Sequence, residues 1–108
     1  MTPDRAYLLV ETRADATANR FLADAEALAR AGERVRLFLV ADAVALGIRG
    51  AHPVLPQVVD AGGQVWIDAF TLAHRALRTA PLADGVTPAG MDDVAEALLT
   101  AGVKVVWH

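Results

Sequence analysis

Short apolar runs alternate along this chain with stretches whose apolar residues recur at helical spacing. The first run, Tyr7–Val10, is continuous and not alternating, which is typical of a strand buried on both faces. The other predicted strands are Val35–Val40, Val65–Ile67, a very short one around Val86–Thr87, and the closing segment "GVKVVWH". Each of these runs ends on polar residues, glycine or proline, so each predicts a separate short strand.

The clearest helix is predicted over residues 16–31, where Phe21, Leu22 and Leu28 fall on one side. Asp15 can cap its start, and Gly32 stands where a helix-ending glycine belongs. The other predicted helical segments are a turn over 43–46, a helix over 55–61 opened near Pro53 or Pro56, and helices over 70–77 and 91–101.

The alternation of strands and helices predicts the α/β class. We expect a three-layer α/β/α sandwich with a mostly parallel sheet of four to five strands and right-handed crossovers. The 108 residues are enough for one hydrophobic core and not for two, so a single domain over residues 1–108 is expected.

Composition and charge exclude several classes of protein. With 55% hydrophobic and 21% charged residues, the chain is globular and not intrinsically disordered. A net charge of −3, and aromatic residues without interleaved basic ones, argue against a nucleic-acid partner. The apolar run Ala6–Val10 is too short for a signal peptide, and no segment approaches the roughly 18 residues of a membrane span. We therefore expect a cytoplasmic protein with no membrane partner.

The chain contains no cysteine, which excludes disulfides, thiolate metal sites and thiol chemistry by this chain alone. The three histidines show none of the spacings of histidine-rich metal sites, and no phosphate-binding or nucleotide-binding glycine motif occurs. No metal and no cofactor are expected.

Carboxylates follow three of the predicted strands: Glu11, Asp42 and Asp68. Ligands of open parallel sheets bind outside the carboxyl ends of the strands, so the three could face one crevice. They could hold a divalent cation. A phospho-acceptor site like that of a response-regulator receiver is a weaker reading, because Glu11 is followed by Thr12 and not by a second acid. Lys104 also lies inside or before the last strand, whereas a receiver has its lysine after that strand.

The reading favoured for Asp68 is a helix cap worth about 1 kcal/mol, because a helix is predicted to start near Phe70. Capping does not exclude ligand contact. Thr71 and His74 are three residues apart, which places both on one face of that helix. Arg75 could pair with Asp68 or offset its charge. A hydrolase built from Thr71, His74 and an aspartate is an alternative with little support.

Three segments together carry a family resemblance that covers nearly the whole chain. They are "YLLVETRADATANRFLADAEALARAGERVRLFLVADAVAL", "GGQVWIDAFTLAHRAL" and "GVTPAGMDDVAEALLTAGVKVVWH". In their order and spacing they resemble the DsrE/DsrF-like family, which includes small subunits of bacterial sulfur-relay complexes. Its members typically read Gly-x-x-Val-x-x-Cys, followed by a helix that bears an arginine. They later show Gly-Val, an acidic helix and a valine-rich strand that ends in an aromatic residue.

The resemblance implies a fold but removes the activity. In sulfur-transferring members the cysteine after the third strand carries a persulfide. That position is Asp68 here, Thr71 stands where some members have a second cysteine, and Arg75 matches the family's arginine. Neither a carboxylate nor a hydroxyl can hold a sulfane sulfur, so the chain cannot carry a persulfide in the family's way.

The resemblance further implies a homo-oligomer, a trimer or a hexamer, or a complex with a DsrE/F-like paralogue. The function expected is that of a non-catalytic oligomeric subunit or binding partner. The alternative is a module that binds a small molecule or an anion in a crevice at the strand ends. Its candidate residues are Thr12, Asp68, Thr71, His74 and Arg75. A metal-dependent enzyme is the least favoured of these three functions.

Overall fold

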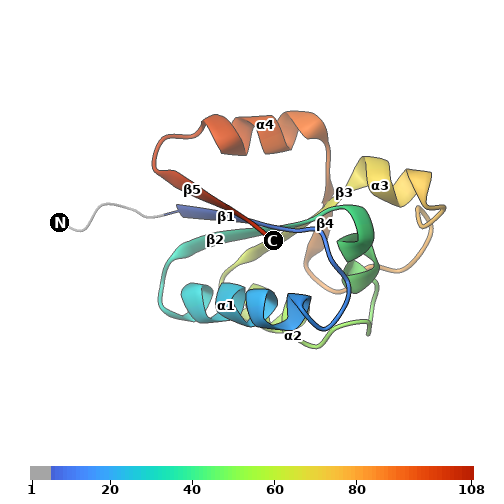
Figure 1. The fold of residues 1–108 in the computed structure, drawn as a ribbon, viewed down its shortest axis with the longest axis horizontal. Helices are drawn as coiled ribbons and strands as arrows, with labels where there is room; N and C mark the ends of the chain where they lie inside the picture. Colours follow the sequence, from blue (N-terminus) through green and yellow to red (C-terminus); the bar gives the residue numbers. More distant parts are fainter. Residues whose placement is uncertain (1–5) are drawn as a thin grey trace.

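The computed structural model describes residues 6–108; residues 1–5, which the expected single domain includes, lie outside the described part. Five strands form one sheet in the order β4-β3-β2-β1-β5, and all neighbouring strands are parallel (Figure 1). They are β1 (Ala6–Glu11), β2 (Arg34–Leu39), β3 (Gln64–Asp68), β4 (Val86–Ala89) and β5 (Val103–Trp107). The predicted parallel α/β architecture is confirmed.

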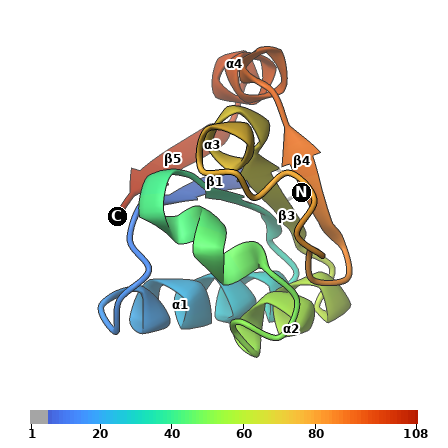
Figure 2. The same ribbon diagram turned by 90° about the vertical axis from the view of Figure 1, so that its right-hand side faces the viewer.

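Helices cover both faces of the sheet, as Figures 1 and 2 show. The helices of residues 6–108 are α1 (Ala18–Arg30), the 3₁₀ helix η1 (Ala41–Gly47), α2 (Val54–Asp60), α3 (Ala69–His74) and α4 (Met91–Leu99). One face carries α1, α2 and η1, and the other carries α4, while α3 lies beyond the carboxyl end of β3. No helix within residues 6–108 is long and apolar enough to cross a membrane.

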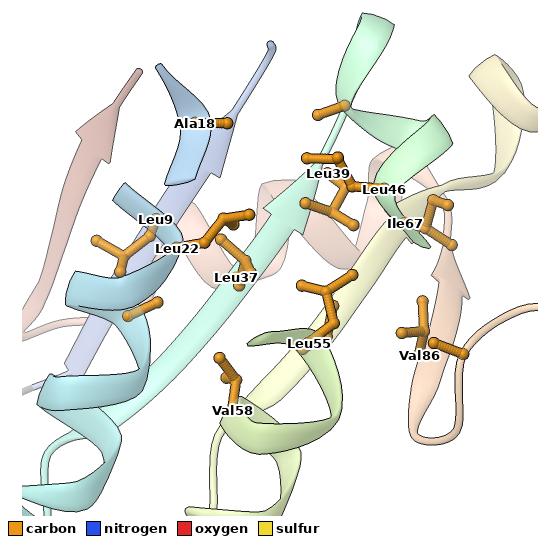
Figure 3. Packing of buried hydrophobic residues seen from close by; sticks show 14 of the residues in the cluster. Leu9, Ala18, Leu22, Leu37, Leu39, Leu46, Leu55, Val58, Ile67 and Val86 are labelled. Atoms are coloured by element: carbon orange, nitrogen blue, oxygen red, sulfur yellow. The ribbon is translucent and has the colours of Figure 1, made fainter. Parts of the chain in front are cut away.

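The larger core lies between the sheet and the α1 side (Figure 3). Alternate strand residues point into it, among them Leu9, Leu37 and Ile67, and they meet Leu22 of α1 and Leu55 of α2. Leu37, Ile67, Leu22 and Leu55 are fully buried. Burying a side chain of this size contributes about 1.5–3 kcal/mol, so this core accounts for most of the hydrophobic stabilisation.

The core on the α4 side is smaller. Leu8, Val10 and Phe38 of the sheet pack there against Val94 and Ala97 of α4. Within residues 6–108, α4 is the helix that packs on this face, and it has nine residues. One short helix leaves part of a five-stranded sheet uncovered, and that part lies at the amino-terminal ends of the strands.

The ends of α1 test two of the capping predictions. Gly32, with φ 88°, ends the helix as predicted, and Glu33 N donates to Leu28 O at 3.1 Å. The predicted cap by Asp15 is wrong, because the helix begins at Ala18 and its N-cap position is Thr17, two residues after Asp15. Asp15 instead accepts hydrogen bonds from the hydroxyl and the backbone N–H of Thr17, and the hydroxyl bond is the main cause that lowers the pKa of its carboxyl.

Candidate functional site

The carboxyl ends of the strands meet at one edge because all five strands are parallel. The predicted crevice residues come from two places on this edge. Thr12 follows β1, whereas Asp68, Thr71, His74 and Arg75 follow β3. Because β2 lies between these strands, the two groups start about 10 Å apart, two strand spacings.

Asp68 is the cap of α3, as predicted. Its carboxylate accepts a hydrogen bond from Thr71 N at 3.3 Å and another from the Thr71 hydroxyl. Both residues are buried, with exposed fractions of 6% and 9%. The position that the family resemblance assigns to a sulfur-carrying cysteine is therefore occupied by a structural carboxylate with a local partner.

Arg75 does not pair with Asp68, so that expectation is wrong. It lies just past the last residue of α3, and its Nη1 is 2.8 Å from Oδ1 of Asp42 on η1. The two side chains are 41% and 69% exposed. An ion pair this accessible to water contributes less than about 1 kcal/mol. It connects the segments that follow β2 and β3 across the edge of the sheet.

His74 is exposed and stacks its ring on that of Phe70, with centroids 5.9 Å apart and an angle of 8° between the planes. The hydroxyl of Thr71 donates to Asp68 and not to His74, although helical spacing places the two residues on one face. A nucleophile-and-base arrangement needs a hydrogen bond from the hydroxyl to the imidazole. That geometry is not formed.

Thr12 is bound on the opposite side, towards β5. Its hydroxyl donates to the backbone oxygen of His108 at 2.7 Å. The neighbouring Glu11 is fully buried, and its Oε2 lies 2.8 Å from Nδ1 of His108. The same carboxylate oxygen accepts from the backbone N–H of Thr12 at 3.0 Å and of Arg13 at 3.2 Å. Sequence reasoning missed His108, because nothing in the local pattern shows that β5 lies beside β1.

The three carboxylates of the strand ends thus have three different partners. Glu11 binds His108, Asp42 binds Arg75, and Asp68 binds its own helix. Among residues 6–108, no group of three or more histidines, aspartates or glutamates lies close enough to hold a metal ion. The possibility that Glu11, Asp42 and Asp68 jointly hold a cation therefore finds no support within the described residues.

A hollow in the described surface lies at the opposite, amino-terminal end of the strands. It has a volume of about 480 Å³ and runs between α4 and the first residues of β1, β2 and β3. Arg34, Arg36 and Trp66 line it from the sheet, and Asp93 and Glu96 line it from α4. Sequence reasoning did not identify this hollow. The sequence feature that could have indicated it is the two-residue spacing of Arg34 and Arg36, which places both on one face of a strand.

No family model and no curated protein sequence matches this chain. Solved structures do. The YchN protein of E. coli is 25% identical with a TM-score of 0.83, over 97% of this chain and 99% of that one. Protein MTH1491 of Methanobacterium thermoautotrophicum, described as of unknown function, is 15% identical with a TM-score of 0.74, over 96% and 98% of the two chains. Together with the five-stranded parallel sheet, these similarities show that the chain has the DsrE/F-like fold.

Proposed function

We propose that this protein is a non-catalytic DsrE/F-like subunit that works through assembly, with its own copies or with a DsrE/F-like paralogue. The observation that carries the proposal is a DsrE/F-like fold in a chain with no cysteine. Persulfide transfer requires a thiolate, and the side chain at the equivalent position is the buried cap Asp68. What remains of the family's properties is the fold and the surfaces that it presents.

Exposed apolar side chains support a partner surface on the α4 side. Leu99 at the end of α4 is 86% exposed, and Trp107 on β5 is 65% exposed. Trp107 shares its strand face with Val103 and Val105, which pack into the core on the α4 side. Aromatic and large aliphatic residues are enriched in interfaces, and truncating one often costs 2 kcal/mol or more of binding energy.

Two further exposed apolar residues belong to the same side. Phe70 on α3 and Met91 on α4 are 71% and 70% exposed. Each lies two residues beyond the paired residues Asp68 and Ala89 of β3 and β4, so both emerge at one corner of the sheet. In addition, β5 is an edge strand whose outer backbone groups are open to pairing.

The test is native mass spectrometry combined with light scattering on the purified chain, alone and mixed with a cysteine-bearing DsrE/F-like paralogue. We expect a trimer, a hexamer or a hetero-complex. Leu99→Glu and Trp107→Glu should each shift the assembly towards monomer. Ala27→Glu, at an exposed site on α1, is the matched control and should leave it intact.

Two results would overturn the proposal. One is a chain that stays monomeric at every concentration and binds no paralogue. The other is stoichiometric uptake of sulfane sulfur from a persulfide donor, which would show sulfur chemistry without cysteine.

A further inference from the structure

The hollow between α4 and the amino-terminal ends of the strands has walls of opposite charge. Arg34 and Arg36 stand on the sheet side, and Asp93 and Glu96 stand on the helix side. A smaller hollow shares Arg36 and Trp66 with it and continues towards β4. The two hollows form one groove along the uncovered part of the sheet.

The strand pattern explains why long polar side chains gather here. Residues of β2 alternate between the two faces, so Arg34 and Arg36 lie on the same face as Phe38. Phe38 is buried against α4, whereas the two arginines lie nearer the start of the strand, where cover is incomplete. The same holds on β3, where Gln64 precedes Trp66 on this face.

The side chain of Arg36, on the sheet side of the groove, is held in place by its neighbours. The guanidinium of Arg36 lies over the ring of Trp66 at 4.1 Å, and its Nε donates to Oε1 of Gln64 at 2.9 Å. Stacking and this hydrogen bond hold the side chain, and within residues 6–108 its Nη1 and Nη2 groups form no further hydrogen bond or ion pair. A guanidinium fixed in this way binds a carboxylate in a forked geometry and loses little conformational entropy on binding.

The two walls do not neutralise each other. Within the described residues, neither Arg34 nor Arg36 forms an ion pair with Asp93 or Glu96. Asp93 uses its Oδ2 to accept from Gly90 N at 3.1 Å, which caps α4 and leaves its Oδ1 available. Opposite charges therefore line one groove and stay apart, which leaves room for a ligand that meets both.

The charge arrangement restricts the chemistry of that ligand. A simple anion would be repelled by the acidic wall, and a simple cation by the arginines. A zwitterion, with a carboxylate at one end and an ammonium group at the other, is attracted at both ends. The lining also includes Ala101 and Val103, which are not fully buried and suit an apolar body. The volume of about 480 Å³ lies within the usual range of small-molecule sites.

We propose that this groove binds a small zwitterion with an apolar side chain, an amino acid or a dipeptide. Its carboxylate contacts Arg36 and Arg34, and its ammonium group faces Glu96 and Asp93. The groove and the partner surface share the elements α4 and β5, but this proposal rests on the charged lining of the groove and not on assembly.

Tryptophan fluorescence gives a direct test. The chain has two tryptophans, so Trp107→Phe leaves Trp66 in the groove as the reporter. We expect a saturable change when L-alanyl-L-leucine is titrated into this variant, and matching heat in calorimetry of the unaltered chain. The N-acetylated and the C-terminally amidated dipeptides each lose one charge and should bind at least about tenfold more weakly.

Variants assign the two ends of the ligand. Arg36→Gln should abolish binding of the dipeptide. Glu96→Gln should weaken the dipeptide but not the N-acetylated form, which has no ammonium group to lose. Arg20→Gln, at an exposed site on α1, is the control. Circular dichroism checks that each variant is folded, and Glu96 is exposed, so its variant tests the site even if Arg36→Gln unfolds.

Three results would overturn the proposal. They are no saturable binding of the dipeptide into the millimolar range, equal binding of all three dipeptide forms, and full binding by folded Arg36→Gln.

Discussion

Nη1 of Arg75 lies 2.8 Å from Oδ1 of Asp42, and each of these residues adjoins an alanine in left-handed backbone conformation. Ala41, which precedes Asp42, has φ 56°, and Ala76, which follows Arg75, has φ 59°. A residue with a Cβ pays about 1 kcal/mol or more for this conformation. The carboxyl edge of the sheet thus holds an ion pair between two strained turns.

Replacing Ala76 with glycine should stabilise the protein. Ala76 stands just after the end of α3, where its N–H donates to Ala73 O at 3.2 Å and the left-handed conformation usually belongs to glycine. Ala76→Gly should raise the free energy of unfolding by about 0.5–1 kcal/mol, measured by urea denaturation. The control Ala73→Gly, inside α3, should lower it by about 1 kcal/mol. Equal destabilisation by both variants would contradict the left-handed assignment.

A double-mutant cycle should find that Arg75 couples to Asp42 and not to Asp68. We expect a coupling below about 1 kcal/mol for Arg75→Ala with Asp42→Ala, and a smaller value at high salt, because the pair is exposed. The matched cycle of Arg75→Ala with Asp68→Asn should give a coupling near zero. A larger coupling in the Asp68 cycle would restore the pairing expected from sequence.

Removing the cap at Asp68 should destabilise the fold through α3. Asp68→Ala should cost about 1–2 kcal/mol, because Thr71 N and the buried Thr71 hydroxyl lose their acceptor. Asp68→Asn keeps an acceptor and should cost much less. Urea midpoints measure both, with Asp60→Ala at an exposed site as the control. Asp68→Ala that costs no more than this control would argue against a capping role.

Breaking the Glu11–His108 pair should lower the free energy of unfolding more than replacing any exposed carboxylate does. Glu11→Ala removes the acceptor shared by the imidazole and two backbone N–H groups, and its fully buried site makes water a poor substitute. We expect a loss of about 2 kcal/mol. Hydrogen exchange should also become faster at the end of β5 and at His108 just beyond it, whose N donates to Val10 O at 2.8 Å.

The control for this variant is Asp24→Ala, at an exposed position on α1, and it should change the stability by less than about 0.5 kcal/mol. If Glu11→Ala lowered the free energy of unfolding no more than Asp24→Ala, the buried pair would contribute nothing to stability.

The sequence by itself determined what depends on neighbours along the chain. The strands follow from short, continuous apolar runs and the helices from apolar residues at helical spacing, so the elements and the parallel α/β class could be predicted. The cap formed by Asp68 and Thr71, three residues apart, and the end of α1 at Gly32 are also local. The missing cysteine is a fact of composition and needed no structure.

Only the tertiary structure decided which distant residues meet. The strand order places β5 beside β1 and so brings His108 to Glu11, 97 residues away in sequence. The positions of α3 and η1 give Arg75 the partner Asp42 in place of Asp68. The groove at the amino-terminal ends exists because short α4 leaves Arg36 uncovered. Contacts of this kind depend on strand order and on how far each helix covers the sheet, and neither quantity has a local period that a sequence can display.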